Sequence, residues 1–100
     1  MLRTVASLPK DARLAGLWPE KVAVESREAL LPGTEVAFRL VLEGNALQVS
    51  AAVQACLVVA KDRRGYVFHI ECPLESLGSA ERQIIALFIA KGRGEPYIER

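Results

Sequence analysis

The sequence carries almost no net charge, which excludes the electrostatic signature of a general nucleic-acid-binding protein. Its 13 lysines and arginines nearly balance its 12 aspartates and glutamates, so the formal net charge is +1. Domains that bind nucleic acids usually present a strongly basic surface. The chain has one histidine and two cysteines, which do not lie at the spacing of a metal-binding cluster. We therefore predict no nucleic-acid partner and no metal site.

Long apolar runs and a leader segment are also missing. No apolar stretch approaches the roughly 18 residues of a membrane span, and the run over residues 55–60 has only the length of a β-strand. Residues 1–5 lack the charged region and apolar core of a signal peptide. We expect a cytoplasmic protein that does not insert into membranes.

Catalytic motifs are absent as well. The sequence has no nucleophile elbow, no phosphate-binding glycine loop and no paired-carboxylate cleft signature. His69 alternates with Val67 and Glu71 along an expected strand, and the sequence gives it no catalytic partner. Cys56 and Cys72 are interpreted as two buried, reduced thiols. We predict that the protein is not an enzyme, has no catalytic residues and needs no cofactor.

What the sequence does contain is the composition of one folded domain. Hydrophobic residues make up 51% and charged residues 25% of its 100 residues, as in ordinary globular proteins with a single core. We expect one domain over residues 1–100. Its core should cover about residues 12–91, between an N-terminal arm (1–11) and a C-terminal tail (92–100).

Alternating apolar and polar residues predict β-strands through most of the core. We predict strands over residues 12–18, 22–26, 36–43, 46–61 and 66–72, and either a short edge strand or an arm before residue 9. Turns are predicted at Pro32 and Gly33, at Gly44 and Asn45, and over residues 62–65. The alternation slips at Ala51 and Ala52, which predicts a bulge where the sheet curls and closes into a barrel.

A helix follows the predicted sheet. Ser79 is the expected N-cap, the helix extends over about residues 80–91, and Gly92 follows it. Ile85 and Ile89 belong to its wide apolar stripe, and are either core residues or a surface for a partner or a second copy. The predicted fold class is mainly β: a small six-stranded antiparallel β-barrel with one C-terminal α-helix.

Several surface residues have an open interpretation. Arg3, Lys10 and Arg13 form either a weak phosphate-binding patch or solvated charge near the chain terminus. Trp18 precedes Pro19 in a predicted turn, where it either marks a recognition surface or covers the mouth of the barrel.

Several of these stretches, taken in order, resemble the PilZ domain family. They are the turn segment at residues 30–36, the hairpin at residues 44–45, the strands at residues 52–58 and 64–70, and the helix segment at residues 77–89. The resemblance covers roughly residues 12–91. It implies a PilZ-like barrel closed by a helix and a role in bacterial signalling, because PilZ domains are best known as receptors for cyclic di-GMP.

Cyclic di-GMP binding in that family rests on two motifs, and this sequence departs from both. One motif is a pair of arginines four residues apart, whereas Ser7 stands four residues after Arg3. The other is Asp/Asn-x-Ser-x-x-Gly. Residues 11–16 keep Asp11 and Gly16 but have Arg13 in place of serine, and the alternative placement at residues 15–20 keeps none of the motif.

The resemblance therefore implies a PilZ-like regulatory module with a degenerate nucleotide site. Such a module would act mainly by protein–protein contacts, through a surface that includes Trp18, Ile85 and Ile89. The alternative is a direct cyclic di-GMP receptor with a non-standard basic set. Its ligand-binding residues would be Arg3, Lys10, Asp11, Arg13 and Gly16. A homodimer is compatible with either function.

Overall fold

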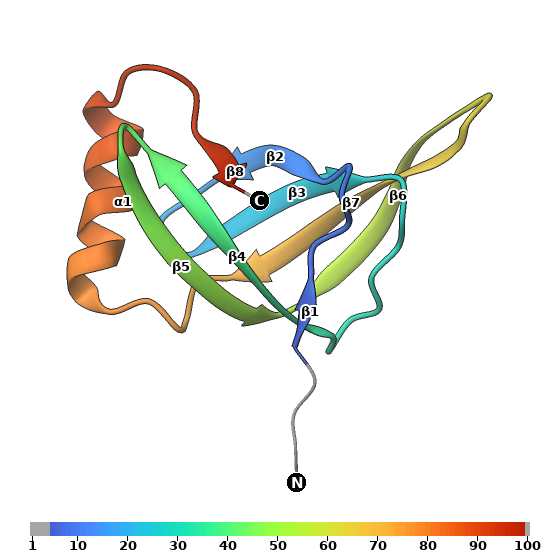
Figure 1. The fold of residues 1–100 in the computed structure, drawn as a ribbon, viewed down its shortest axis with the longest axis horizontal. Coiled ribbons are helices and arrows are strands. Elements are labelled where there is room, and N and C mark those ends of the chain that lie inside the picture. The colour runs from blue at the N-terminus through green and yellow to red at the C-terminus, as the bar shows by residue number, and fades with distance from the viewer. Residues whose placement is uncertain (1–4, 100) are drawn as a thin grey trace, which may run out of the picture.

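Two four-stranded sheets and one helix make up the computed structural model of the chain, which describes residues 5–99 (Figure 1). The strands are β1 (Ala6–Ser7), β2 (Arg13–Leu17), β3 (Lys21–Ser26), β4 (Glu35–Leu42), β5 (Asn45–Ala52), β6 (Ala55–Asp62), β7 (Gly65–Pro73) and β8 (Tyr97–Glu99), and the helix is α1 (Ser79–Lys91). Arg3, which the sequence proposed as a ligand contact, lies outside the described residues.

β4 is the central strand of the first sheet. Along its whole length it pairs with β5, and its other edge is shared by β1 and β8. β1 runs parallel to β4 at Val36 and Ala37, whereas β8 runs antiparallel to it from Arg39 to Val41. The predicted N-terminal arm and C-terminal tail therefore each contribute a short strand to this sheet.

The second sheet has the order β2-β3-β7-β6, and its pairs are all antiparallel. β6 is one of its edges and pairs with β7 alone among the described strands. In Figure 1 the hairpin formed by β6 and β7 extends well beyond the other strands, at the upper right. This hairpin is the most prominent projection of the described chain.

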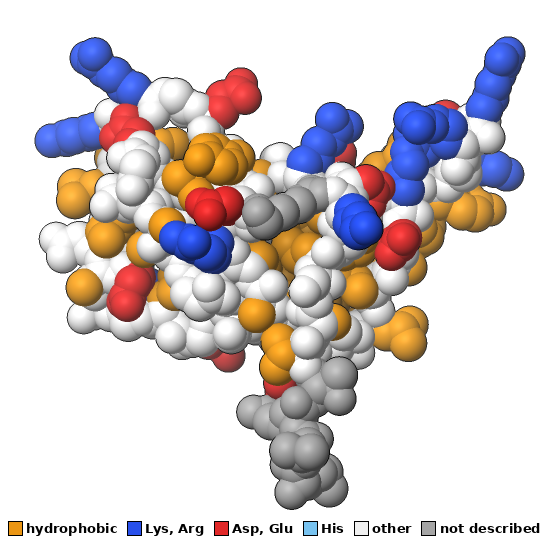
Figure 2. All heavy atoms as spheres, viewed as in Figure 1, with side chains coloured by type: hydrophobic (Ala, Val, Ile, Leu, Met, Phe, Trp, Pro, Cys, Tyr) orange, Lys and Arg blue, Asp and Glu red, His pale blue; other side chains and the backbone are white. Residues whose placement is uncertain are grey.

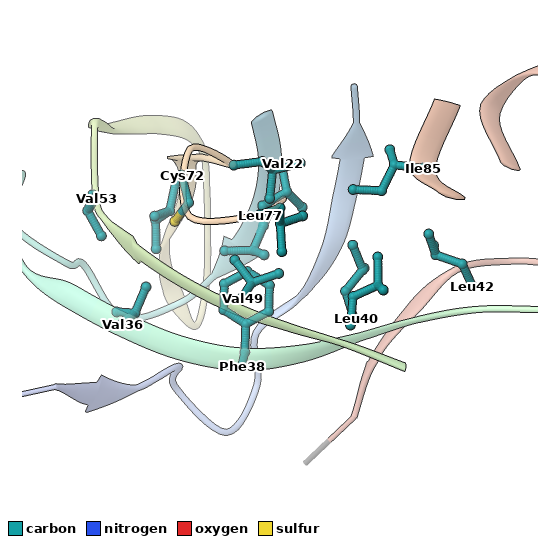
Figure 3. Packing of buried hydrophobic residues seen from close by; sticks show 14 residues of the cluster. Val22, Val36, Phe38, Leu40, Leu42, Val49, Val53, Cys72, Leu77 and Ile85 are labelled. Atoms are coloured by element: carbon teal, nitrogen blue, oxygen red, sulfur yellow. The ribbon is translucent and has the colours of Figure 1, made fainter. Parts of the chain in front are cut away.

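The inner faces of the two sheets share one hydrophobic core with α1. Ile85 of α1 is fully buried and lies over Leu40 and Leu42 (Figure 3). The cluster also takes Val36, Phe38, Leu47 and Val49 from the first sheet, and Val22, Val24, Ile70 and Cys72 from the second. Full burial of one such aliphatic side chain stabilises the fold by about 1.5–3 kcal/mol. The apolar alternation along each strand thus determines which face lies inside.

The mainly β class with one helix is confirmed, but the six-stranded barrel is wrong. Residues 5–99 form eight strands in two sheets, and these do not close into a barrel. The slip at Ala51 and Ala52 marks a crossing between the sheets rather than a bulge. Val53 N donates to the Thr34 carbonyl at 2.8 Å, and Gln54 N donates to the Glu71 carbonyl at 2.8 Å. The single bent strand predicted over residues 46–61 is therefore two strands in different sheets.

The predicted turns are present, but one of them is shifted by a residue. Gly33 has a φ of 92°, as the third position of a type II turn requires. Between β4 and β5 the turn residues are Glu43 and Gly44, with φ of 48° and 84°, a type I′ geometry. Asn45 was predicted as a turn residue, but it already pairs with Leu42.

α1 begins one residue earlier than predicted. Gly78, not Ser79, is the N-cap, and no side chain caps the helix. Glu81 lies in the first turn and Lys91 in the last, where both complement the helix dipole. Gly92 follows the helix, as predicted. Within residues 5–99, no helix combines the length and the apolar character needed to cross a membrane.

Candidate functional site

Of the residues predicted to bind a ligand, four lie within residues 5–99, and only two of these four meet at one place. Asp11 and Arg13 line a hollow of about 270 Å³, which we call the arginine hollow. The other residues that line it are Glu25, Ser26, Arg27, Arg64 and Val67. Lys10 is exposed in the turn before β2, Gly16 lies beneath the Trp18 ring, and neither lines the hollow. The predicted set is therefore divided between separate parts of the surface.

Asp11 holds the segment before β2 against the end of β3. Its carboxylate accepts hydrogen bonds from the Ser26 hydroxyl at 3.0 Å and from the Arg27 backbone N–H at 2.7 Å. The Ser26 hydroxyl oxygen in turn accepts from the Glu28 N–H at 3.0 Å. Ser26 is almost completely buried, and a buried hydroxyl without partners would be costly. These contacts give Asp11 a structural role at the rim of the arginine hollow.

An arginine–aspartate pair links the end of β3 to the tip of the β6–β7 hairpin. The Arg27 guanidinium donates two hydrogen bonds to the Asp62 carboxylate, at 2.8 and 2.6 Å. Asp62 also accepts from the Arg64 backbone N–H at 2.8 Å. The Arg27 hydrogen bond is the main reason that the pKa of Asp62 falls to about 2, and the same contact raises the pKa of Arg27. The pair thus stays charged over the physiological pH range.

Two other arginines border the hollow beside acidic residues. Glu25 lies opposite Arg13 in the β2–β3 pair, and the charge of Arg64 helps to lower the pKa of Asp62. Within residues 5–99, neither the Arg13 nor the Arg64 guanidinium forms an ion pair. Guanidinium groups bind phosphates and carboxylates through two parallel hydrogen bonds. The arginine hollow could therefore accept an anionic ligand.

Trp18 covers β2 and does not close a barrel. A Cβ atom built on Gly16 would lie 2.6 Å from the Trp18 ring, so only glycine leaves room for the indole in this position. The Lys21 ammonium lies 4.9 Å from the ring centroid, a cation–π contact. Trp18 is 39% exposed, so the indole also contributes to the outer surface.

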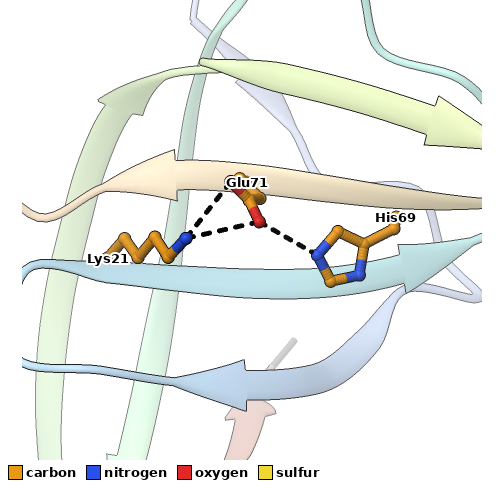
Figure 4. Close-up of polar contacts among 3 residues, drawn as sticks. All are labelled: Lys21, His69 and Glu71. Atoms are coloured by element: carbon orange, nitrogen blue, oxygen red, sulfur yellow. Dashed lines mark hydrogen bonds and ion pairs between the residues drawn. The ribbon is translucent and has the colours of Figure 1, made fainter.

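The same lysine belongs to a polar cluster on the second sheet (Figure 4). Lys21 Nζ lies 3.4 Å from Glu71 Oε1, and His69 Nε2 lies 3.2 Å from Glu71 Oε2. The His69 hydrogen bond, helped by the Lys21 charge, holds the pKa of Glu71 below its ordinary value. The sequence pattern indicates no partner for His69, although Glu71 stands two residues further along the same face of β7. The contacts cross-link two neighbouring strands, which indicates a structural role.

The buried cysteine of the described chain is an unreactive thiol, and the acidic residues form no metal site there. Cys56 and Cys72 are free thiols, but only Cys72 is buried, so the prediction of two buried thiols is wrong for Cys56. Burial raises the pKa of Cys72 to about 11. A thiol with this pKa is protonated at neutral pH and is a poor nucleophile. Within residues 5–99, no three His, Cys, Asp or Glu side chains are arranged to hold a metal ion.

The helix surface predicted for a partner is only partly available. Ile85 is fully buried between α1 and the first sheet, so its inclusion in a partner surface was wrong. The wide apolar stripe concealed this difference, because the pattern does not show which part of the stripe faces the sheets. Ile89 and Leu87 are about half exposed on the outer side of α1.

The strongest concentration of exposed apolar residues lies elsewhere, on the β6–β7 hairpin. We call its outer part, residues 57–66, the hairpin arm. Leu57, Val58 and Val59 are consecutive, and their exposed fractions are 59%, 56% and 52%, respectively. Tyr66 across the hairpin is also about half exposed, and Lys61 lies over its ring. Figure 2 shows this region at the upper right, with Lys and Arg side chains toward its tip and hydrophobic side chains beneath them.

The sequence predicted the strand of the hairpin arm but not its exposure. Residues 55–60 are apolar on both faces of β6. Such a run is typical of a strand buried on both sides. Here it belongs to an edge strand that extends past the core, so the only signal was an apolar run directly before a charged turn.

Comparisons with known proteins add no assignment. No protein-family model matches the chain, and no curated protein or solved structure matches it either. The resemblance to the PilZ family therefore stays a prediction.

The charge on Glu71 should stabilise the fold at neutral pH. Because the pKa of Glu71 is lowered in the folded protein, its contribution is present above the unfolded-state pKa and is lost as the pH falls through the folded-state pKa. We expect Glu71→Gln to reduce the free energy of unfolding at about pH 7. At about pH 3 the same substitution should reduce the free energy of unfolding by less. Urea unfolding at the two pH values measures both effects.

Glu28→Gln is the matched control, because Glu28 is exposed and its carboxylate forms no ion pair within residues 5–99. This control should change stability little at either pH. An equal loss of stability for Glu71→Gln at both pH values would contradict the proposed role of its charge.

Proposed function

We propose that this chain is a PilZ-like regulatory module, without enzymatic activity, that acts by binding a protein through its hairpin arm. The observation that carries the proposal is the run of three consecutive apolar side chains, Leu57 to Val59, each more than half exposed. They lie on an edge strand that has one neighbour among the described strands. Because successive side chains of a strand point to opposite faces, this run exposes apolar side chains on both faces of β6 beside its open edge. Single exposed apolar residues are common on protein surfaces, whereas a concentration of them marks an interaction site.

The backbone of β6 supports the same function. An edge strand presents unpaired N–H and C=O groups, to which another strand can be added. Main-chain hydrogen bonds would provide affinity, and the exposed side chains would provide selectivity. A strand-adding partner therefore uses both features of the hairpin arm.

The polar side chains considered for chemistry make contacts within the described chain. Asp11 is engaged by Ser26 and Arg27, and His69 is engaged by Glu71. The two free thiols, Cys56 and Cys72, are compatible with the cytoplasm, the compartment that the sequence predicts.

A photo-crosslinking amino acid at position 58 tests this function in cells that naturally make the protein. We expect the photo-crosslinking amino acid that replaces Val58 to form covalent adducts with a protein, either a second copy of this chain or a different protein. The control is the same amino acid at Leu31, an apolar residue that is 76% exposed in a loop outside the hairpin arm. Equal labelling from both positions, or no adduct from position 58, would contradict the function.

The arginine hollow favours a second candidate, a direct receptor for cyclic di-GMP. The specific observation is that the Arg13 and Arg64 guanidinium groups border the hollow without ion-pair partners in the described chain. Guanidinium groups can bind both the phosphates and the guanine edges of such a ligand. Of the residues predicted from the sequence, this site would use Arg13 beside Asp11, with Arg64 as a new member.

Isothermal titration of the purified protein with cyclic di-GMP tests this candidate, with cyclic di-AMP and GTP as controls. A receptor should bind selectively with micromolar affinity, about −8 kcal/mol. Arg13→Ala and Arg64→Ala should each weaken binding at least about tenfold. Arg63→Ala is the matched control, because Arg63 does not line the hollow. Absence of binding at high ligand concentration excludes the receptor function for this chain.

A further inference from the structure

We propose that the partner of the hairpin arm is a second copy of this chain, with the two β6 strands antiparallel across a two-fold axis. This inference rests on the proposed function, because it names the partner of the same surface. It depends on three properties of β6: an open edge, exposed apolar residues and opposite charge at its two ends.

The open edge of β6 is poorly protected against pairing. Edge strands are usually guarded by charged side chains, proline or bulges. β6 has no proline and no charge over residues 55–60, and its charges begin only at Lys61. An irregularity between Val58 and Ala60 is its one local guard. An apolar run of this length on a bare edge promotes association.

One end of β6 is basic. Arg63 and Arg64 follow the strand at the hairpin tip, and neither guanidinium has an ion-pair partner within residues 5–99. Lys61 adds a third cation, while Asp62 is already engaged by Arg27. The tip therefore offers uncompensated positive charge to whatever lies alongside it.

The opposite end of β6 has an excess of acidic over basic residues. Gln54, the residue before the strand, shares a hollow with Glu20 and Glu75. Lys21 and Arg82 also line this hollow, and the Arg82 guanidinium donates to the Leu74 and Leu77 carbonyls. Both glutamates are exposed, and neither forms an ion pair in the described chain. Glu71 lines the same hollow, but Lys21 and His69 already pair with it. Glu20 and Glu75 are therefore the carboxylates that can receive a cation from outside.

This distribution of charge makes the surface self-complementary. In an antiparallel pair of β6 strands, the basic tip of each copy lies beside the acidic end of the other, and the contact occurs twice. A parallel pair would place like charges together. A two-fold interface requires that each copy present both halves of every contact, and β6 does so. A closed dimer would also cover both open edges and leave none for further addition.

Sedimentation equilibrium of the full chain tests the inference. The wild-type protein should change from monomer to dimer as its concentration rises, and should go no further. Val58→Asp should raise the dissociation constant at least about tenfold, because it places a charge in the centre of the pairing edge. Leu87→Asp is the matched control, since Leu87 is an apolar residue of similar exposure on α1. Its dimer should match the wild type.

A charge exchange tests the antiparallel arrangement without relying on one variant. Arg63→Glu with Arg64→Glu should weaken the dimer, and so should Glu20→Arg with Glu75→Arg. Combining the four substitutions should restore dimerisation, because each end again faces its opposite. A wild-type monomer at every concentration, open-ended assembly, or a combined variant weaker than both pairs would overturn the inference.

The two proposals can fail separately. If the wild-type chain is monomeric but position 58 crosslinks to a different protein in cells, the second-copy inference is wrong and the proposed function stands. If the chain is monomeric and position 58 gives no adduct, both are wrong.

Discussion

The chain crosses from one sheet to the other at Val53 and Gln54, and this crossing determines where β6 begins. Val53 bonds through its N–H and its carbonyl to the turn before β4, whereas Gln54 donates to Glu71 in β7. Two adjacent residues thus belong to different sheets. Because Val53 is also buried in the core, the crossing cannot slide along the chain. The strand after it must therefore begin at the edge of the second sheet.

The position of this edge strand explains the exposed apolar surface. β6 and β7 are long, and the core lies beside only part of them, so the hairpin arm extends past it (Figure 1). The Arg27–Asp62 pair holds the tip against the end of β3, which leaves Arg63 and Arg64 to define its charge. One polar contact therefore both orients the hairpin arm and makes its end basic. The surface proposed for a partner is therefore exposed because of the position of β6 in the sheet and the length of the hairpin.

The sequence predicted local structure well where one residue type decides the geometry. Gly33 has the positive φ that its turn requires, and Gly92 follows the helix. Alternating residues of β4 face the core. Its errors of one residue, at Asn45 and Ser79, arise where neighbouring residues could serve the same role. A period of two shows which residues share a face but not which sheet they join. The pattern at the crossing therefore predicts a bulge in a barrel, although the chain changes sheets there.

The candidate sites were harder to predict than the fold. Asp11 and Arg13 do come together, because the sequence separation between them is short, but Arg64 joins them through a long-range contact that no local pattern shows. Burial of Ile85 depends on the rotation of α1 against the sheets. Residues 55–60 form an uninterrupted apolar run, which is typical of a strand buried on both faces, but here the strand is exposed. Composition does not distinguish a strand buried in the core from an exposed strand that binds a partner, since both are rich in apolar residues.

Amide hydrogen exchange of β6, measured at low and high protein concentration, shows whether two copies of the chain pair along this edge. If two copies pair along this edge, the exchange of amides within residues 56–60 should slow as the concentration rises. Amides in β4, which is already paired on both sides, should show no comparable change. Exchange in β6 that is fast and independent of concentration would contradict the pairing of two copies, because the edge would then be open at all times.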